Sequence, residues 1–176
     1  MSMLGGIRLQ QNGMVLLISL VFLLLLSQIG LSSIQGAVTQ QKVASSLWQR
    51  NQSFQSAESG LRQGESVVQR GGPGMPVCHS VMTCAPPNEA FSLTGAGTNP
   101  VSAITWLALR GGLYGVQSLG EGAGLAHLPL DTRAALFRIT AVGLAGQSRT
   151  VLEAVYARVE EGGSVKFRRI SWRQLQ

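Results

Sequence analysis

Apolar residues are concentrated in one stretch near the amino terminus. No charged residue lies between Arg8 and Lys42, and inside this gap the run from Met14 to Leu26 contains one polar residue, Ser19. Extended to Ile34, the stretch spans about 31 Å as a helix, which is close to the thickness of a bilayer's hydrocarbon core. A charged side chain would cost a few kcal/mol there. The pattern therefore predicts a membrane-spanning helix over 14–35.

Three interpretations of this segment are open. In the first it is a cleaved secretory signal, for which Gly30-Leu31-Ser32 is the candidate cleavage site. In the second it is a signal anchor that is never cut. In the third, a peptidase at the cytoplasmic face of the membrane cuts after Gly13, so that residues 1–13 are a leader and Met14 begins the mature chain. The third is favoured because the following segment continues the helix.

The segment over 36–70 has one apolar face. It contains no proline, and apolar residues recur at helical spacings of three, four and seven. The residues of this stripe that we expect to pack are Val43, Leu47, Phe54, Leu61 and Val68. Gly71-Gly72-Pro73-Gly74 then ends the helix. The pattern predicts one long helix from Met14 to about Gln69, apolar all round in its first half and amphipathic in its second.

Residues 71–133 are predicted to be rich in loops, because glycine and proline clusters interrupt them. Cys78 and Cys84 lie in this region, beyond the membrane segment. An oxidising compartment favours a disulfide between them. A metal site using both cysteines and His79 lacks further ligands, so no metal or cofactor is expected.

The pattern changes to strands over 134–176. Apolar and polar residues alternate around Phe137, Ile139 and Ala141, and two further alternating runs follow after short turns at 143–147 and 161–163. Three strands joined by short turns form an antiparallel meander. A helix stripe lying on such a sheet buries both apolar faces, which makes the predicted fold class α+β.

Charge gives little information about partners. The chain carries 14 Lys and Arg against 8 Asp and Glu, for a net charge of +6, and the cations are spread along the sequence. Because no dense basic helix interleaved with aromatic residues is present, no nucleic-acid partner is expected. A search for paired carboxylates, nucleophiles with a neighbouring base, or phosphate-binding loops likewise leaves no candidate catalytic residue.

Two stretches carry a resemblance to the PilX-type minor pilins of type IV pili. The apolar run from Gly13 to Leu26 is similar to the family's amino terminus. Arg50-Asn51-Gln52-Ser53-Phe54-Gln55-Ser56-Ala57-Glu58 resembles the family's Arg-Asn-x-Ala-Phe-x-Ala-Ala-Glu, with serines at two of the alanines. The resemblance covers about 8–65, and the last strands, at 137–141, 151–156 and 171–175, resemble the family more weakly.

This resemblance implies a structural subunit and not an enzyme. It implies cleavage by a prepilin peptidase, residence as a single-pass protein in the inner membrane, and a periplasmic carboxyl-terminal domain. The implied partners are other minor pilins, the major pilin, membrane lipid and a large tip adhesin.

Ile18 departs from the pattern of most pilins, which place a Glu at the fifth residue after the cleaved glycine. A carboxylate in an apolar helix bundle is costly unless it is paired, and its partner there is the amino terminus of a neighbouring subunit. A subunit with Ile18 offers no such counter-charge, so we expect it at the tip of the filament.

The resulting hypothesis is a minor pilin that primes pilus assembly with its partners and supports adhesion and twitching motility from the tip. A pseudopilin of a type II secretion system is an alternative with the same architecture. A membrane-anchored periplasmic protein of unrelated function is the other, and an enzyme of that kind would need a polar pocket within 71–133.

Overall fold

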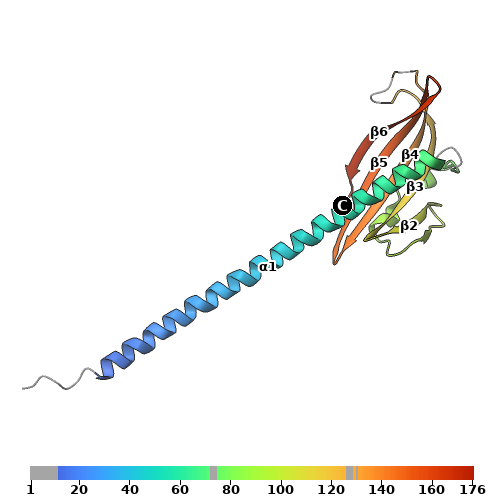
Figure 1. Ribbon diagram of the computed structural model, residues 1–176. Helices are drawn as coiled ribbons and strands as arrows, with labels where there is room; N and C mark the ends of the chain where they lie inside the picture. Colours follow the sequence, from blue (N-terminus) through green and yellow to red (C-terminus); the bar gives the residue numbers. More distant parts are fainter. Residues whose placement is uncertain (1–11, 72–74, 126–128, 130) are drawn as a thin grey trace, which may run out of the picture. The chain divides into compact units, whose positions relative to one another are not determined.

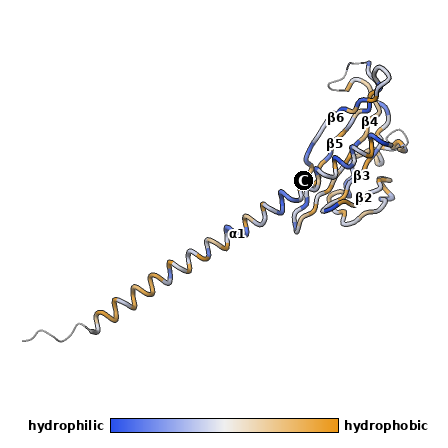
Figure 2. The backbone as a smooth tube through the Cα atoms, in the orientation of Figure 1, coloured by the Kyte–Doolittle hydropathy of each residue, from blue (hydrophilic) through white to orange (hydrophobic). Residues whose placement is uncertain are grey.

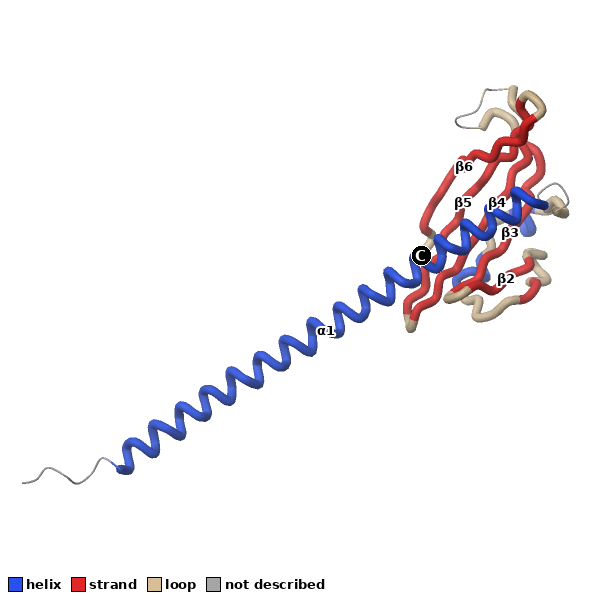
Figure 3. The backbone as a smooth tube through the Cα atoms, in the orientation of Figure 1, coloured by secondary structure: helices blue, strands red, loops and turns tan. Residues whose placement is uncertain are grey.

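The computed structural model describes residues 12–71, 75–125, 129 and 131–176. The expected leader, 1–13, therefore lies outside the described residues except for its last two positions. The helices are α1 (Asn12–Gly71), α2 (Val81–Cys84) and the 3₁₀ helix η2 (Asn88–Phe91). The strands are β1 (Gly97–Thr98), β2 (Thr105–Leu109), β3 (Gly112–Gly122), β4 (Ala134–Ala145), β5 (Ser148–Glu161) and β6 (Ser164–Gln174) (Figures 1 and 3).

The chain forms two compact units, residues 1–45 and residues 46–176. We call the second unit the head. The described part of the first unit is the amino-terminal portion of α1, which Figure 2 shows as largely hydrophobic along its first half. The head contains the rest of α1 and all of the strands. The expected helix from Met14 to about Gln69 is confirmed, with ends within two residues of those predicted.

The head is built on a six-stranded antiparallel sheet in which the strands follow their order in the sequence, β1 to β6. The predicted α+β fold and the meander of β4, β5 and β6 are confirmed. The sharp turn between β5 and β6 depends on Gly162 and Gly163, which both have positive φ, a conformation that costs glycine little.

Between the loops of 71–133 lie three strands, β1, β2 and β3. β3 extends over 11 residues and pairs with β4 along most of its length. Its alternation is hard to recognise in the sequence because Gly112, Gly115, Gly120 and Gly122 stand where side chains would reveal it. Gly115 has a packing reason: a Cβ there would lie 2.5 Å from Cγ2 of Ile104, which is closer than real Cβ contacts.

α1 covers one face of this sheet within the head. Ala57, Leu61 and Val68 of the helix form a buried cluster with alternate residues of the strands. The strand members of this cluster are Tyr114, Phe137, Ile139, Ala141, Leu152, Ala154 and Tyr156. The alternation predicted for 137–141 therefore selects the face that meets the helix.

Small residues let α1 approach the sheet closely. Ser53, Ala57, Gly60 and Gly64 follow one another at spacings of three or four along the helix, and all four are buried. A Cβ on Gly60 would lie 2.8 Å from the Cβ of Ala141, which is closer than real Cβ contacts. Ser53, which stands at one of the family's alanines, also forms a buried hydrogen bond with Thr150 at 2.8 Å between the two hydroxyl oxygens.

The opposite face of the sheet is also covered. Ala90 of η2, together with Ile104 and Trp106, packs on Leu113, Val142 and Val151. Arg149 holds this covering segment in place, because its guanidinium donates hydrogen bonds to the carbonyl oxygens of Ala90 at 3.0 Å and Leu93 at 2.8 Å. As a result β4 and β5 are buried on both faces.

Replacing Gly143 by alanine tests the close approach of α1 to the sheet. The new Cβ would collide with the carbonyl oxygen of Ser53 and would lie 2.7 Å from the amide nitrogen of Ala57, both of which are helix backbone. We expect Gly143→Ala to lower the free energy of unfolding by about 1–3 kcal/mol. Thermal unfolding of the full chain in detergent, followed by circular dichroism, measures this.

Gly95→Ala is the matched control, because a Cβ at Gly95 meets nothing within 4 Å. It should change the free energy of unfolding by less than about 0.5 kcal/mol. Equal effects of the two substitutions would contradict the proposed close packing.

Candidate functional site

The amino-terminal part of α1 presents apolar side chains on every side. Over 14–34 the large apolar residues are between 46% and 71% exposed, so no face of this segment is covered by the described part of the chain. Among the described residues, α1 is the one helix long and apolar enough to cross a membrane, with a mean hydropathy of 2.6 in its most apolar window. Exposed apolar surface of this extent is unfavourable in water and favourable in lipid or against other helices.

Gly13, Met14 and Ile18 all lie in the first two turns of α1. A Cβ on Gly13 would meet nothing within 4 Å, so packing within this chain does not require glycine there. Met14 is 65% exposed and Ile18 is 50% exposed. The bond after Gly13 lies in the first turn, where backbone N–H groups lack partners within the helix and unwinding is easiest.

The structure divides the five residues of the predicted packing stripe. Leu61 and Val68 are buried against the sheet, and Phe54 is half-buried. Val43 and Leu47 are each 55% exposed, so these two do not pack on the sheet of this chain, and their packing against other helices stays a prediction. The periodicity is continuous, but the contacts with the sheet begin only at about Ser53.

The strands at the carboxyl-terminal side of the sheet hold α1 through two side-chain contacts. Phe54 meets Trp172 of β6 edge to face, with ring centroids 6.4 Å apart. The hydroxyl of Tyr156 donates a hydrogen bond to Glu65 at 3.4 Å. Burial raises the pKa of Tyr156 above its usual range, and the charge of Glu65 adds to this rise.

A disulfide joins Cys78 and Cys84, which confirms the pairing predicted from the sequence. The loop between them contains α2, whose amino terminus is capped by Ser80. The hydroxyl of Ser80 accepts a hydrogen bond from the amide of Thr83, and the hydroxyl of Thr83 accepts one from the amide of Ser80. No residue of α2 is buried, and Val81 is 88% exposed.

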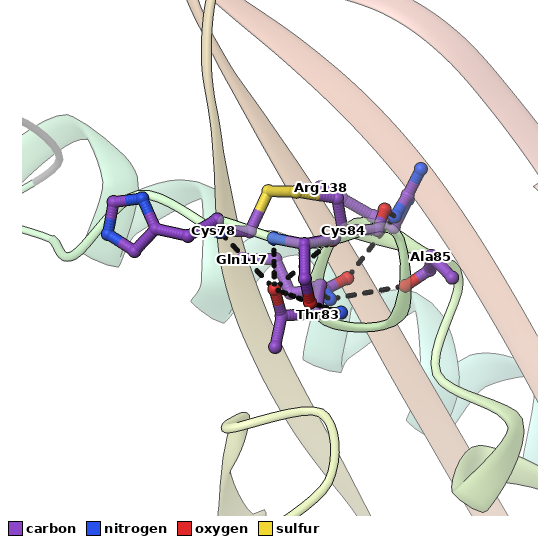
Figure 4. The surroundings of a disulfide bond; sticks show 8 residues. Cys78, Thr83, Cys84, Ala85, Gln117 and Arg138 are labelled. Atoms are coloured by element: carbon purple, nitrogen blue, oxygen red, sulfur yellow. Dashed lines mark hydrogen bonds between the residues drawn. A yellow bond between two sulfur atoms is a disulfide. The ribbon is translucent and has the colours of Figure 1, made fainter.

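Two side chains of the sheet attach this disulfide loop, residues 78–84, to the strands beneath it (Figure 4). The amide nitrogen of Gln117 in β3 donates hydrogen bonds to the carbonyl oxygens of Thr83 at 2.7 Å and Ala85 at 3.2 Å. The guanidinium of Arg138 in β4 donates to the carbonyl oxygen of Cys84 at 2.6 Å. The loop is thus held by main-chain carbonyls rather than by burial of its own side chains.

Arg138 continues this polar contact across the sheet to Glu153. Glu153 of β5 is only 2% exposed and lies 3.4 Å from Arg138. From the other side, Arg173 of β6 donates a hydrogen bond from Nε to Oε1 of Glu153 at 2.9 Å, and its Nη2 forms an ion pair with the same oxygen at 2.8 Å. Burial lowers the pKa of Arg138, and the charge of Glu153 opposes this effect. We call Gln117, Arg138, Glu153 and Arg173 the polar row.

An open cleft of about 450 Å³ lies in the head between the carboxyl-terminal part of α1 and the edge of the sheet. The apolar residues that line the cleft include Val67 of α1, Met75 and Val77 after it, and Leu107 and Val116 of the strands. The residues that line it include no Asp, Glu, Lys or Arg. The lining is mostly apolar in area, and its polar residues are His79, Ser80, Thr83, Ser102, Thr105, Gln117 and Ser118.

Comparison with known proteins assigns the amino-terminal segment. The family described as PilX N-terminal matches residues 12–62. This segment is of the PilX type. The match contains Gly13, Met14 and Ile18 and ends within the head portion of α1. No curated protein and no solved structure matches the chain.

The match over 12–62 supports a pilin-like protein of the type IV pilus, and the long apolar helix of this segment is consistent with anchoring in a membrane. The PilX family is structural and its members interact with other pilus components. The resemblance suggested for the last strands lies outside the matched residues and stays a prediction.

The polar row was not expected from the sequence. Its members are separated by 15 to 21 residues and lie on four different strands. One signal was available: Glu153 is a lone acid within an apolar strand run, which indicates a buried charge with a partner.

Glu153→Gln should destabilise the head strongly. The substitution leaves Arg138 without its counter-charge in a buried position, so we expect a loss of about 3–5 kcal/mol in the free energy of unfolding. Glu160→Gln is the control on the same strand: that carboxylate pairs with Arg158 at 3.0 Å but its side chain is 69% exposed, so the loss should stay below about 1 kcal/mol. Denaturant titration of the full chain in detergent compares the two, and similar losses would contradict the role assigned to Glu153.

Proposed function

We propose that this chain is a minor pilin that is cleaved after Gly13 and that primes the assembly of a type IV pilus from its tip. Before assembly it is a single-pass protein of the inner membrane, with its amino terminus in the cytoplasm and its head in the periplasm. With partner minor pilins and the major pilin it starts the filament, and together with a large tip adhesin it supports adhesion and twitching motility. This role requires no catalysis.

One observation carries the proposal: the PilX-type segment keeps its apolar surface exposed on all sides over 14–34. A helix that is apolar all round needs an apolar environment on all sides. Lipid supplies that environment before assembly and neighbouring pilin helices supply it afterwards, so the same surface serves both states. A cleaved secretory signal would discard this surface.

Ile18 supports a position at the tip. The segment over 14–34 contains no acidic residue, so the chain has no carboxylate there to pair with the amino terminus of a subunit above it. A subunit without a carboxylate avoids the cost of burying one, and it lacks that electrostatic contact with a following neighbour. Both properties suit the one position in a filament that has no neighbour above.

Mass spectrometry of the mature amino terminus tests the processing. We expect a chain that begins at Met14, recovered with the membrane fraction and with sheared pili. The Gly13→Leu variant should keep residues 1–13, because the peptidase would meet a bulky side chain at the cleavage point, and Gly30→Leu serves as the control that is still cut. A mature chain that begins near Ser33 would refute the proposal.

The Ile18→Glu variant tests the position. We expect the added carboxylate to admit a subunit above this one, so that antibody against the head labels the shaft of the pilus or the number of pili falls. Electron microscopy with gold-labelled antibody measures both, and Ile18→Leu is the control with unchanged charge. Unchanged position and unchanged piliation in Ile18→Glu would overturn the assignment to the tip.

A further inference from the structure

The disulfide loop has few attachments other than the disulfide and its polar contacts. α2 has no buried residue, and Val81 and Met82 are 88% and 67% exposed. The amide of Cys78 donates one hydrogen bond to the carbonyl of Ser118, at 2.9 Å. The remaining anchors are the bonds from Gln117 and Arg138 to carbonyl oxygens of the segment 83–85. Because little apolar surface holds the loop down, its closure depends on the disulfide.

β6, at the other end of the polar row, is also weakly buried. None of its residues is buried, and Val165 and Trp172 are more than 40% exposed. On the face away from α1, one hydrogen bond and one ion pair join Arg173 to Glu153 at the centre of the sheet. Phe167, Ile170 and Trp172 add partly buried apolar contacts. Glu153 holds Arg138 on its other side, so the loop and β6 are joined through three side chains.

We propose that the Cys78–Cys84 disulfide is a redox-controlled latch, and that closing it secures β6 on the sheet through Arg138, Glu153 and Arg173. A dithiol reductant opens the latch. The sulfur–sulfur bond breaks, each cysteine takes up one proton and becomes a thiol, and the two electrons come from the dithiol, which is oxidised to its own disulfide.

Opening acts on β6 through water. In the closed state the loop covers Arg138 and supplies the Cys84 carbonyl as a hydrogen-bond partner. When the loop moves away, Arg138 becomes hydrated, and its attraction to Glu153 weakens because the surrounding dielectric rises. Glu153 then forms more contacts with water and fewer with Arg173, so β6 separates from β5 more often. This mechanism uses contacts within the head and does not depend on a position at the pilus tip.

Hydrogen exchange of the full chain in detergent, with and without dithiothreitol, tests the latch. We expect the amides of 164–174 to exchange about tenfold faster after reduction, the effect of losing one charged hydrogen bond. The amides that join β3 to β4 should change little, and reoxidation should restore the original rates. Unchanged exchange in 164–174 would overturn the proposal. Equal acceleration in all strands would also overturn it, because the disulfide would then stabilise the head as a whole.

Two arginine variants separate the latch from general stabilisation. Arg138→Gln removes the link between loop and Glu153, so reduction should no longer change exchange in 164–174. Arg149→Gln is the matched control: this arginine also donates from a strand to main-chain carbonyls, but those belong to Ala90 of η2 and to Leu93. It should keep the full response. A full response in Arg138→Gln would overturn the proposal. If that variant does not fold, the comparison of the oxidised and reduced wild-type chain decides the question.

Discussion

An apolar helix surface that the chain itself does not cover is the constraint on which the architecture depends. Over 14–34 the large apolar side chains of α1 are about half or more exposed, and the segment has no charged residue. Such a surface is stable in lipid or among similar helices and not in water. The second part of α1 has only one apolar face, and the sheet of the head covers that face.

The head holds α1 on the sheet by close packing of small residues rather than with large side chains. Buried small residues of α1 lie directly on the sheet, and Gly143 admits the helix backbone. The two alanines of the PilX pattern that are serines here show two different outcomes. Ser53 is buried and bonds to Thr150, while Ser56 remains partly exposed and is the side chain that a Cβ on Gly111 would meet. A family's small residues can thus change identity where a hydroxyl finds a partner.

The face of the sheet away from α1 is organised by polar groups. Gln117 and Arg138 hold the disulfide loop, and Arg149 holds the segment after η2, in each case through main-chain carbonyls. Carbonyls of irregular segments need hydrogen-bond donors wherever water is excluded, and strand arginines supply them here. Glu153 then neutralises a charge that would otherwise be buried alone.

Local patterns in the sequence determined α1, its membrane-like half, the strands β4 to β6 and the cysteine pair, because periodicity, turns and cysteine number are properties of neighbouring residues. The tertiary structure decided that Val43 and Leu47 are exposed although they continue the stripe of Leu61 and Val68. It also decided that glycine-rich residues 112–122 form a strand, and that Arg138, Glu153 and Arg173 meet. Contacts of this kind depend on strand register between distant segments, which no local pattern encodes.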